Sequence, residues 1–442
     1  MLFTPDSPIF QGASLYAPFH STVVPVAYTG MKDEYLAGRS AAWLGVALNF
    51  SPVFDVKGPD AVRFLNWVAV NKDFGNFPEG MSKHVLICNE EGYMLADGVV
   101  IKVAENHFRT YWLAPVIHYF LSTSGMNIEG EYVTDEYFFQ IDGPKSLEIV
   151  ERATGADLHD LKFARNKRID FDGHEAVVHR LGMSGALAYE MHGNAENAVE
   201  AYKKLRATVE EFGGKVQGVF NYPVVNHTVA GYPNQYLHYI YPVHESGEGL
   251  SEFITQTPYL VLTPTGSAAD RLTNFYATPY DVNWGYLVNF DHDFIGKAAL
   301  EKIAANRPRK TVTLEWNPED IADVVASQYR GTEVEPYDDI NHSGLRPEEF
   351  AAGTIRGDYV VDGDAKVGVA TGRTIAYHER KMVSLASIST ELAVEGRELE
   401  VLWGDLGHPV KRVRVKVARF PYYNGPYRNE KFDTSNIPRL VH

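Results

Sequence analysis

Hydrophobic positions in the first part of the chain switch between helical and strand-like spacing. The segments GPDAVRFLNWVAVNKD (58–73) and APVIHYFLSTSG (114–125) place apolar residues on one helix face. Strand-like runs occupy 51–58, 84–103 and 107–115, and Glu91–Gly92 is typical of a hairpin turn. The order strand, helix, hairpin, helix, strand predicts a ferredoxin-like split βαβ unit.

The same pattern then recurs. EYFFQIDG (136–143) is strand-like, and the helix that begins at Pro144 is expected to end at Gly155. Two further strand-like segments, RIDFDGHEAVVHRLG and ALAYEMHG, precede a long amphipathic helix that ends near Gly213. The sequence therefore predicts an α+β fold in which two related units lie side by side.

The pattern changes at the basic stretch 307–310. Short β-rich runs with few helical patterns follow it, which predicts a small C-terminal β-barrel or sandwich. Residues 318–357 are polar and acidic, and we expect an irregular insertion there. The predicted domains are a region of two ferredoxin-like units (1–307) and a β-domain (308–442).

Composition narrows the classes of function. The 442 residues carry a formal net charge of −16, which disfavours nucleic acid as a partner, although solubility alone also explains it. The single cysteine, Cys88, lies in an apolar run and is predicted to be an inert buried thiol. Since we identify no signal peptide and no membrane span, we expect a cytoplasmic enzyme without a membrane partner.

Common catalytic motifs do not occur in this sequence. We find no phosphate-binding GxxxxGK[ST], no GxGxxG after a strand and no GxSxG nucleophile elbow. The histidine pairs His174/His179 and His238/His244 lack the spacing and the further ligands of a metal site, so we predict no protein-bound metal.

Three residues stand out chemically. Asp97 and Glu190 are carboxylates within apolar strands, where each needs a partner. Each could form a structural ion pair or face solvent, or could bind a polar heterocycle such as a pterin, whose amino group and ring N–H are donors. Tyr222, in GVFNYPVVNHTVAGY, could serve packing or chemistry. The many aromatic residues suit a pocket for flat ligands but also suit a large core.

Several segments resemble the glycine-cleavage T-protein family, and they do so in family order from about residue 40 to about residue 404. Within that family the chain is most similar to the tetrahydrofolate-dependent aryl-ether O-demethylases and to the sesamin-degrading enzyme. The resemblance implies two ferredoxin-like units that form a folate-binding core, followed by a β-barrel. The segments that carry it are FDHDFIGKAALEKI, TPYDVNWGYLVNF, FQIDGPKSLEIV, LGMSGALAYEMHG and KVGVATGRTIAYHERKMVSLASI.

The resemblance also implies roles for individual residues. Asp97 matches the aspartate beside the reactive pterin nitrogen, and Glu190 matches the glutamate that binds the pterin ring. Gln140 matches a glutamine that contacts folate, and Tyr232 lies near the aromatic residue that stacks on the pterin. Tyr222 matches the tyrosine at the ether oxygen, where it would donate a proton while Asp97 orients the folate. We also expect the barrel to close over this cleft.

Departures from the family pattern narrow the substrate. The paired aspartates of the T-protein read Ala96–Asp97 here, which argues against aminomethyl transfer. Leu113 stands where demethylases of aromatic acids place an arginine, and with Trp112 it predicts a pocket for an uncharged ring, unless Arg109 or Lys102 reaches that pocket.

The predicted activity follows from these matches. It is transfer of a methylene or methyl group from an aryl ether, such as a methylenedioxyphenyl compound or a methoxyarene, to tetrahydrofolate. The alternatives are a vanillate- or syringate-type demethylase, a non-catalytic folate-binding scaffold and a one-carbon partner of an amine oxidase. The sequence leaves the ether and the oligomeric state open.

Overall fold

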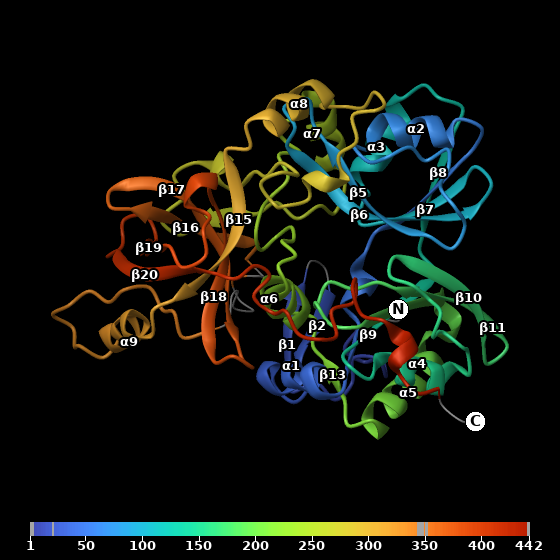
Figure 1. Ribbon diagram of the computed structural model, residues 1–442, viewed down its shortest axis with the longest axis horizontal. Coiled ribbons are helices and arrows are strands. Elements are labelled where there is room, and N and C mark those ends of the chain that lie inside the picture. The colour runs from blue at the N-terminus through green and yellow to red at the C-terminus, as the bar shows by residue number, and fades with distance from the viewer. Residues whose placement is uncertain (1–3, 20–21, 343–348, 350–351, 440–442) are drawn as a thin grey trace.

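Three regions surround a central connecting segment in the computed structural model, which describes residues 4–19, 22–342, 349 and 352–439 (Figure 1). The chain begins with the hairpin β1 (Leu15–Phe19) and β2 (Thr22–Ala27), followed by helix α1 (Met31–Ser40). Each of the three regions encloses its own hydrophobic core.

The first ferredoxin-like unit has a five-stranded sheet in the order β5-β6-β7-β4-β8. Helices α2 and α3 bury their apolar faces in the core of this unit, as their spacing predicted. The hairpin between β5 and β6 turns at Glu91–Gly92, where Gly92 has a φ of 84°. The elements are β4 (Val53–Lys57), α2 (Ala61–Val68), β5 (Ser82–Cys88), β6 (Met94–Ala104), β7 (His107–Tyr111), α3 (Val116–Thr123) and β8 (Glu129–Val133).

The second unit repeats this arrangement in a sheet of order β10-β11-β12-β9-β3-β13. It differs in one respect: β3 (Trp43–Gly45), from the N-terminal part of the chain, lies between β9 and β13. Helix α4 ends at Gly155, whose φ of 73° is left-handed, as predicted. The elements are β9 (Glu136–Asp142), α4 (Ser146–Thr154), β10 (Arg165–Phe171), β11 (His174–Arg180), β12 (Ala188–Asn194), α5 (Ala198–Glu211) and β13 (Lys215–Gln217).

A connecting region leads from the second unit to the third region. It begins with the π-helical turn Tyr222–His227, which continues directly into the short helix α6 (Thr228–Ala230) near the middle of Figure 1. The later elements of this region are α7 (Glu248–Thr255), β14 (Thr263–Thr265) and α8 (Lys297–Ala305).

The third region is a closed β-barrel. Six strands follow the order β16-β17-β18-β15-β20-β19, and β19 pairs back onto β16. Closure leaves no free sheet edge among these strands. The predicted α+β fold, with two ferredoxin-like units and a barrel, is confirmed. The strands are β15 (Arg309–Trp316), β16 (Thr354–Asp362), β17 (Ala365–Ala376), β18 (Lys381–Ser389), β19 (Glu398–Trp403) and β20 (Lys411–Ala418).

The prediction that residues 318–357 are irregular is wrong at both ends of that range. Helix α9 (Pro318–Ser327) begins directly after β15, and β16 starts at Thr354. The Asn317 side chain accepts a hydrogen bond from the Asp320 N–H, and Pro318 occupies the first helical turn. Local capping therefore forms a helix in a stretch that composition alone described as irregular. Residues 343–348 and 350–351 lie outside the described part.

The C-terminal segment returns from the barrel to the second unit. In Figure 1 it passes close to α4, and the Arg180 guanidinium donates to the carbonyl oxygens of Asn429 and Phe432. These contacts join the last residues of the chain to β11. The predicted division at residues 307/308 remains a prediction.

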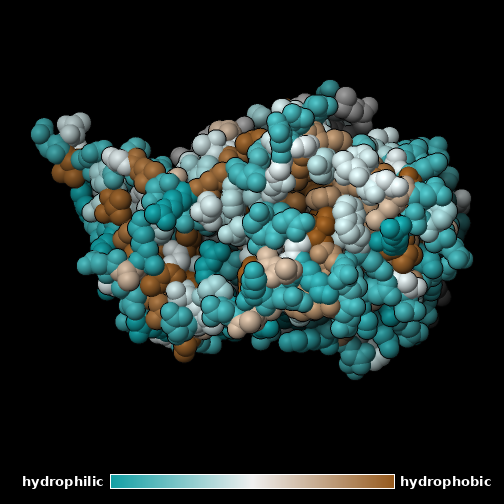
Figure 2. Space-filling model, turned by 90° about the horizontal axis from the view of Figure 1, so that it is seen from above, coloured by the Kyte–Doolittle hydropathy of each residue, from teal (hydrophilic) through white to brown (hydrophobic). Residues whose placement is uncertain are grey.

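The outer surface is mainly hydrophilic on the face shown in Figure 2, where hydrophobic residues occur in small scattered groups. Such scattered residues are normal for a folded protein. Among the described helices, none is long and apolar enough to span a membrane.

Candidate active site

A cavity of about 1350 Å³, part of which is open to solvent, is lined by both ferredoxin-like units. The first unit contributes residues of β6 and β7, and the second contributes residues of β9, β11 and β12. Most of the lining is apolar or aromatic, and no lysine or arginine occurs in it within the described chain. The lining residues with titratable or amide side chains are Asp97, Tyr111, His179, Glu190, Tyr222, His227, Asn234, Gln235, Tyr236 and Tyr241.

The barrel contacts the connecting segment that borders the cavity. Tyr236 and Leu237 border the cavity and also a small pocket of the barrel, so the connecting segment lies between the two. The Thr371 hydroxyl of β17 donates to the His238 carbonyl oxygen at 3.2 Å and so ties this segment to the barrel. No residue of the barrel strands borders the cavity within the described chain, and the expectation that the barrel closes over the cleft remains a prediction.

Asp97, on β6, is held as a carboxylate by three side chains. Its Oδ1 accepts from the Tyr239 hydroxyl at 2.7 Å and from the Tyr241 hydroxyl, and His84 Nε2 lies 3.3 Å from Oδ2. Burial opposes the charge, but the hydrogen bonds and the charge of His84, together with both tyrosine hydroxyls, outweigh burial and lower the pKa of Asp97. The carboxylate is thus charged and fixed in position before any ligand arrives.

Glu190, on β12, has a much poorer environment. It lies opposite Gln140 of β9, whose Nε2 donates to Oε1 at 3.2 Å, and it is 6% exposed. Burial raises the pKa of Glu190 to about 8, and the bond from Gln140 offsets burial only in part. A ligand that donates hydrogen bonds to Glu190 would favour its charged form.

Tyr222 begins the π-helical turn and lies on the cavity wall. Its hydroxyl oxygen accepts the Met183 N–H at 3.0 Å, and its ring packs edge-on against Trp43 with a centroid distance of 5.7 Å. Burial, followed by the charges of Glu190 and Asp142, raises the pKa of Tyr222 well above its ordinary value. The phenol is therefore protonated and held in a defined orientation.

His227 ends the same turn and also borders the cavity. Its ring lies edge-on to that of Tyr222 with a centroid distance of 4.6 Å. Nδ1 lies 3.0 Å from the Tyr232 carbonyl oxygen, and a carbonyl only accepts, so Nδ1 carries the proton. Burial lowers the pKa of His227 to about 4. The imidazole is neutral, with its lone pair on Nε2.

The remaining predicted residues do not all reach the cavity. Trp112 borders it, whereas Leu113 is buried in the core of the first unit. Gln140 acts on Glu190 from behind and is not itself part of the lining. The Tyr232 hydroxyl accepts from Arg428 at 3.2 Å, and its side chain lies outside the lining.

Arg109 and Lys102, the two cations that could have paired with the carboxylate of an acidic substrate, also lie outside the cavity lining. Arg109 is held by ion pairs with Asp55 and Glu136. Lys102 is likewise not among the lining residues.

Several residues of the site were missed in the sequence. Tyr239 and Tyr241 alternate in LHYIYPV, and this period of two placed them on one side of an extended segment. His84 and Asp97 lie on the two strands of the β5–β6 hairpin. The predicted hairpin therefore already indicated that these two side chains could lie close together. His227 had no such signal, because five-residue spacing does not bring side chains together on an α-helix.

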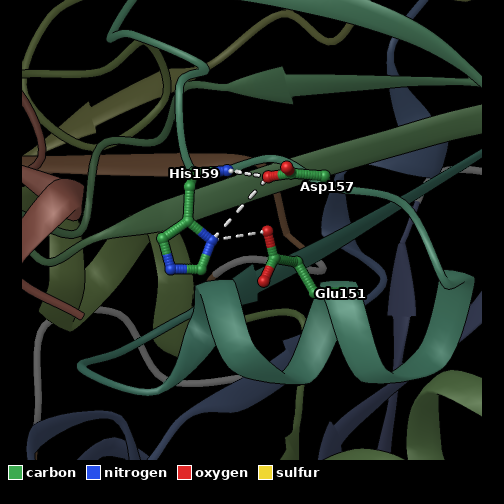
Figure 3. Close-up of side chains that lie close together, drawn as sticks. All are labelled: Glu151, Asp157 and His159. Atoms are coloured by element: carbon green, nitrogen blue, oxygen red, sulfur yellow. Dashed lines mark hydrogen bonds and ion pairs between the residues drawn. The ribbon is translucent and has the colours of Figure 1, made fainter. Parts of the chain in front are cut away.

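A cluster of Glu151, Asp157 and His159 lies outside the cavity (Figure 3). His159 Nδ1 is 2.8 Å from Glu151 Oε1, and Nε2 is 3.0 Å from the Ile437 carbonyl oxygen. Since Nε2 must donate to that carbonyl, and Nδ1 faces a carboxylate, the ring is engaged on both sides. The cluster anchors the C-terminal segment, and its geometry is that of an ion pair.

Comparison with known proteins shows the family to which the chain belongs. The model described as "GCVT N-terminal domain" matches residues 11–225. The chain is 40% identical over 457 residues to "Sesamin methylene transferase" of Sinomonas sp. (strain No.22), covering 99% of this chain and 98% of that protein. It is 28% identical to "Syringate O-demethylase" of Sphingobium sp. (strain NBRC 103272 / SYK-6), over 90% and 91% of the two chains.

A solved structure shares the fold. It is the glycine cleavage system aminomethyltransferase T from Bartonella henselae, with a TM-score of 0.67 and 17% sequence identity. The likeness covers 96% of this chain and 98% of the other.

Proposed function

This chain belongs to the family of the GCVT N-terminal domain, and from that membership we propose that it is an enzyme that cleaves an aryl ether and transfers the released one-carbon unit to tetrahydrofolate. The ether is a methylenedioxyphenyl compound or a methoxyarene, in line with the names of the two relatives, sesamin methylene transferase and syringate O-demethylase. The resemblance read from the sequence is confirmed at the level of the family.

The observation that carries this proposal is the composition of the cavity wall. The carboxyl groups of Asp97 and Glu190 and the phenol of Tyr222 are among the polar groups that border a space lined mainly by apolar and aromatic side chains. Aromatic walls suit flat ligands, and a few polar groups orient them.

The residues fit tetrahydrofolate. Glu190 has one hydrogen bond from the protein and a raised pKa, so it lacks the donors that a pterin amino group and ring N–H would supply. When bound, tetrahydrofolate supplies the nucleophilic nitrogen that takes the one-carbon unit. Glu190 binds the ring, and Asp97 offsets positive charge that develops near that nitrogen.

Tyr222 serves the leaving group. As the ether C–O bond breaks, its hydroxyl donates a proton to the departing phenolic oxygen, a step worth about 10²–10⁴-fold when the donor is well placed. The backbone N–H of Met183 holds the hydroxyl in orientation during this transfer. The mostly apolar wall limits water at the reacting carbon.

The substrate is uncharged in this proposal. No lysine or arginine borders the cavity among the described residues, and burying an unpaired carboxylate costs several kcal/mol. An aromatic-acid demethylase would need such a cation, and a scaffold without chemistry would have no use for a buried phenol beside the acids. An enzyme that cleaves neutral ethers has a role for each of Asp97, Glu190 and Tyr222.

The test is incubation of the protein with tetrahydrofolate and one ether at a time. The panel holds a neutral methylenedioxybenzene, a neutral guaiacol-type methoxyarene and vanillate, and the phenol and the one-carbon folate are measured by liquid chromatography and mass spectrometry. We expect phenol and one-carbon folate in equal amounts, with higher kcat/KM for the neutral ethers. Cleavage without tetrahydrofolate, or no cleavage of any ether, would refute the function, and preference for vanillate would refute the neutral pocket.

A further inference from the structure

His227 presents a basic nitrogen to the cavity, and the proposed function as described has no task for it. The Tyr232 carbonyl holds the proton on Nδ1, and Nε2 has no hydrogen-bond partner within the described chain. Because His227 borders the cavity, Nε2 is the nitrogen left for a bound molecule.

The π-helical turn explains why His227 lies beside Tyr222. Hydrogen bonding from residue i to i+5 brings position 227 back next to position 222, and the ring centroids are 4.6 Å apart. Single π-helical turns occur frequently at functional sites. An uncommon backbone geometry therefore places a base next to the proton donor.

We propose that His227 is a catalytic residue whose Nε2 takes the proton that the nucleophilic amine of tetrahydrofolate releases as the new C–N bond forms. This inference rests on the function proposed above. It assigns the second half of the proton transfer, since Tyr222 supplies only the proton for the oxygen.

The two carboxyl groups of the cavity are poorer candidates for the base that takes this proton. Asp97 has both carboxylate oxygens engaged, by Tyr239, Tyr241 and His84. Glu190 accepts from Gln140, and its charge acts on Tyr222. The charge that reaches His227 is that of Asp97, which stabilises an imidazolium there.

The protons and bonds balance without a further reactant. For each C–O bond that breaks, one C–N bond forms and one proton passes from nitrogen to oxygen. His227 takes the proton from nitrogen, and Tyr222 gives one to the oxygen that leaves with the bonding electrons. The His227 imidazolium then returns its proton to the Tyr222 phenolate, which restores both residues.

The first experiment uses two variants of His227. In His227→Asn the amide nitrogen replaces Nδ1 and keeps a donor for the Tyr232 carbonyl, while the base is lost. We expect kcat to fall by about 10²-fold or more with little change in KM. In His227→Ala, added imidazole should restore part of kcat. His118→Asn, on α3 outside the cavity lining, is the matched control and should keep wild-type kcat.

The second experiment does not need turnover. In ¹⁵N-histidine NMR, the signals that His227→Asn removes belong to His227. We expect the Nδ1–H tautomer in the free protein and a change in the Nε2 shift when tetrahydrofolate is added.

Each result decides the assignment. Wild-type kcat in His227→Asn, an Nε2–H tautomer, or loss of kcat that imidazole does not rescue together with an unperturbed Nε2 would each overturn it. If the wild type cleaves no ether, the proposed function fails, while the NMR titration still decides whether Nε2 meets the amine.

Discussion

The two ferredoxin-like units each present one acid to the shared cavity, and they treat these acids in opposite ways. In the first unit, Asp97 accepts from Tyr239 and Tyr241 and lies beside His84, and its pKa is lowered. In the second unit, Glu190 receives one bond, from Gln140, and its pKa is raised to about 8.

This difference separates two tasks that similar side chains perform. An acid that is already saturated with donors is a fixed negative charge, and it needs no reorganisation when positive charge develops nearby. An acid that lacks donors gains the most from a ligand that supplies them. Related folds thus create a preorganised charge on one side of the cavity and a ligand-binding acid on the other.

Removal of the fixed charge should have the largest effect. Asp97→Asn keeps the shape of the side chain but loses the negative charge, so we expect kcat to fall by about 10²–10³-fold, with tetrahydrofolate affinity changed much less. Single-turnover kinetics and calorimetry measure the two quantities separately. An equal loss in both would show that Asp97 serves binding and that the contrast with Glu190 is false.

Removal of Glu190, the acid with few hydrogen-bond donors, should weaken the binding of tetrahydrofolate. Glu190→Ala loses a charge-assisted contact to the pterin worth roughly 1.5–3 kcal/mol, or about 10–150-fold in the Kd of tetrahydrofolate. Glu190→Gln, which keeps an acceptor oxygen, should lose less. Calorimetric titration of both variants is the measurement, and unchanged affinity in the alanine variant would remove Glu190 from the folate site.

Tyr222→Phe tests the phenol that borders the same cavity as the two acids. The ring and its packing on Trp43 remain, so the midpoint of thermal unfolding should change little, while kcat falls at least about tenfold. Tyr189→Phe is the matched control, because that buried hydroxyl has no hydrogen-bond partner among the described residues and lies in the core of the second unit. Wild-type turnover in the Tyr222 variant would make Tyr222 a packing residue.

The smallest effect is on stability, where the two acids should have opposite slopes with pH. The pKa of Glu190 is raised from 4.5 to about 8, so the unfolded chain loses this proton first and the folded protein loses stability as pH rises between those values. The pKa of Asp97 lies below its ordinary 3.8, so its contribution is present above that pH and is lost as pH falls further.

Thermal unfolding of the ligand-free protein against pH measures both slopes. Between pH 5 and 8 the wild type should lose stability relative to Glu190→Gln, whereas its advantage over Asp97→Asn should shrink only in acid. Parallel curves for Glu190→Gln and the wild type would show that the pKa of Glu190 is not raised in the folded protein.

Local patterns allowed much of the fold to be predicted. The helices after Gly58 and Pro144 and the hairpin at Glu91–Gly92 were found because apolar spacing and turn residues act within a few positions. Helix α9 was missed because composition was judged over a long stretch, whereas its cap depends on Asn317 and Pro318.

The candidate site was predicted only in part. Asp97, Glu190, Tyr222 and Trp112 do border one cavity, as expected from the family pattern. Leu113 and Tyr232 do not: Leu113 packs into the core of the first unit, and the Tyr232 hydroxyl accepts a hydrogen bond from Arg428. Their roles, like those of the other site residues, remain proposals.

What the sequence determined by itself was the order of elements, the family and the two acids, because each depends on short-range spacing or on a residue type at a motif. Only the tertiary structure decided how those acids are charged. The partners of Asp97 lie 13 to 144 positions away, and Gln140 lies 50 positions from Glu190. A pKa depends on burial and on groups brought together by folding, and the pairing of Tyr222 with His227 depends on a π-helical turn that no α-helical or strand period reveals.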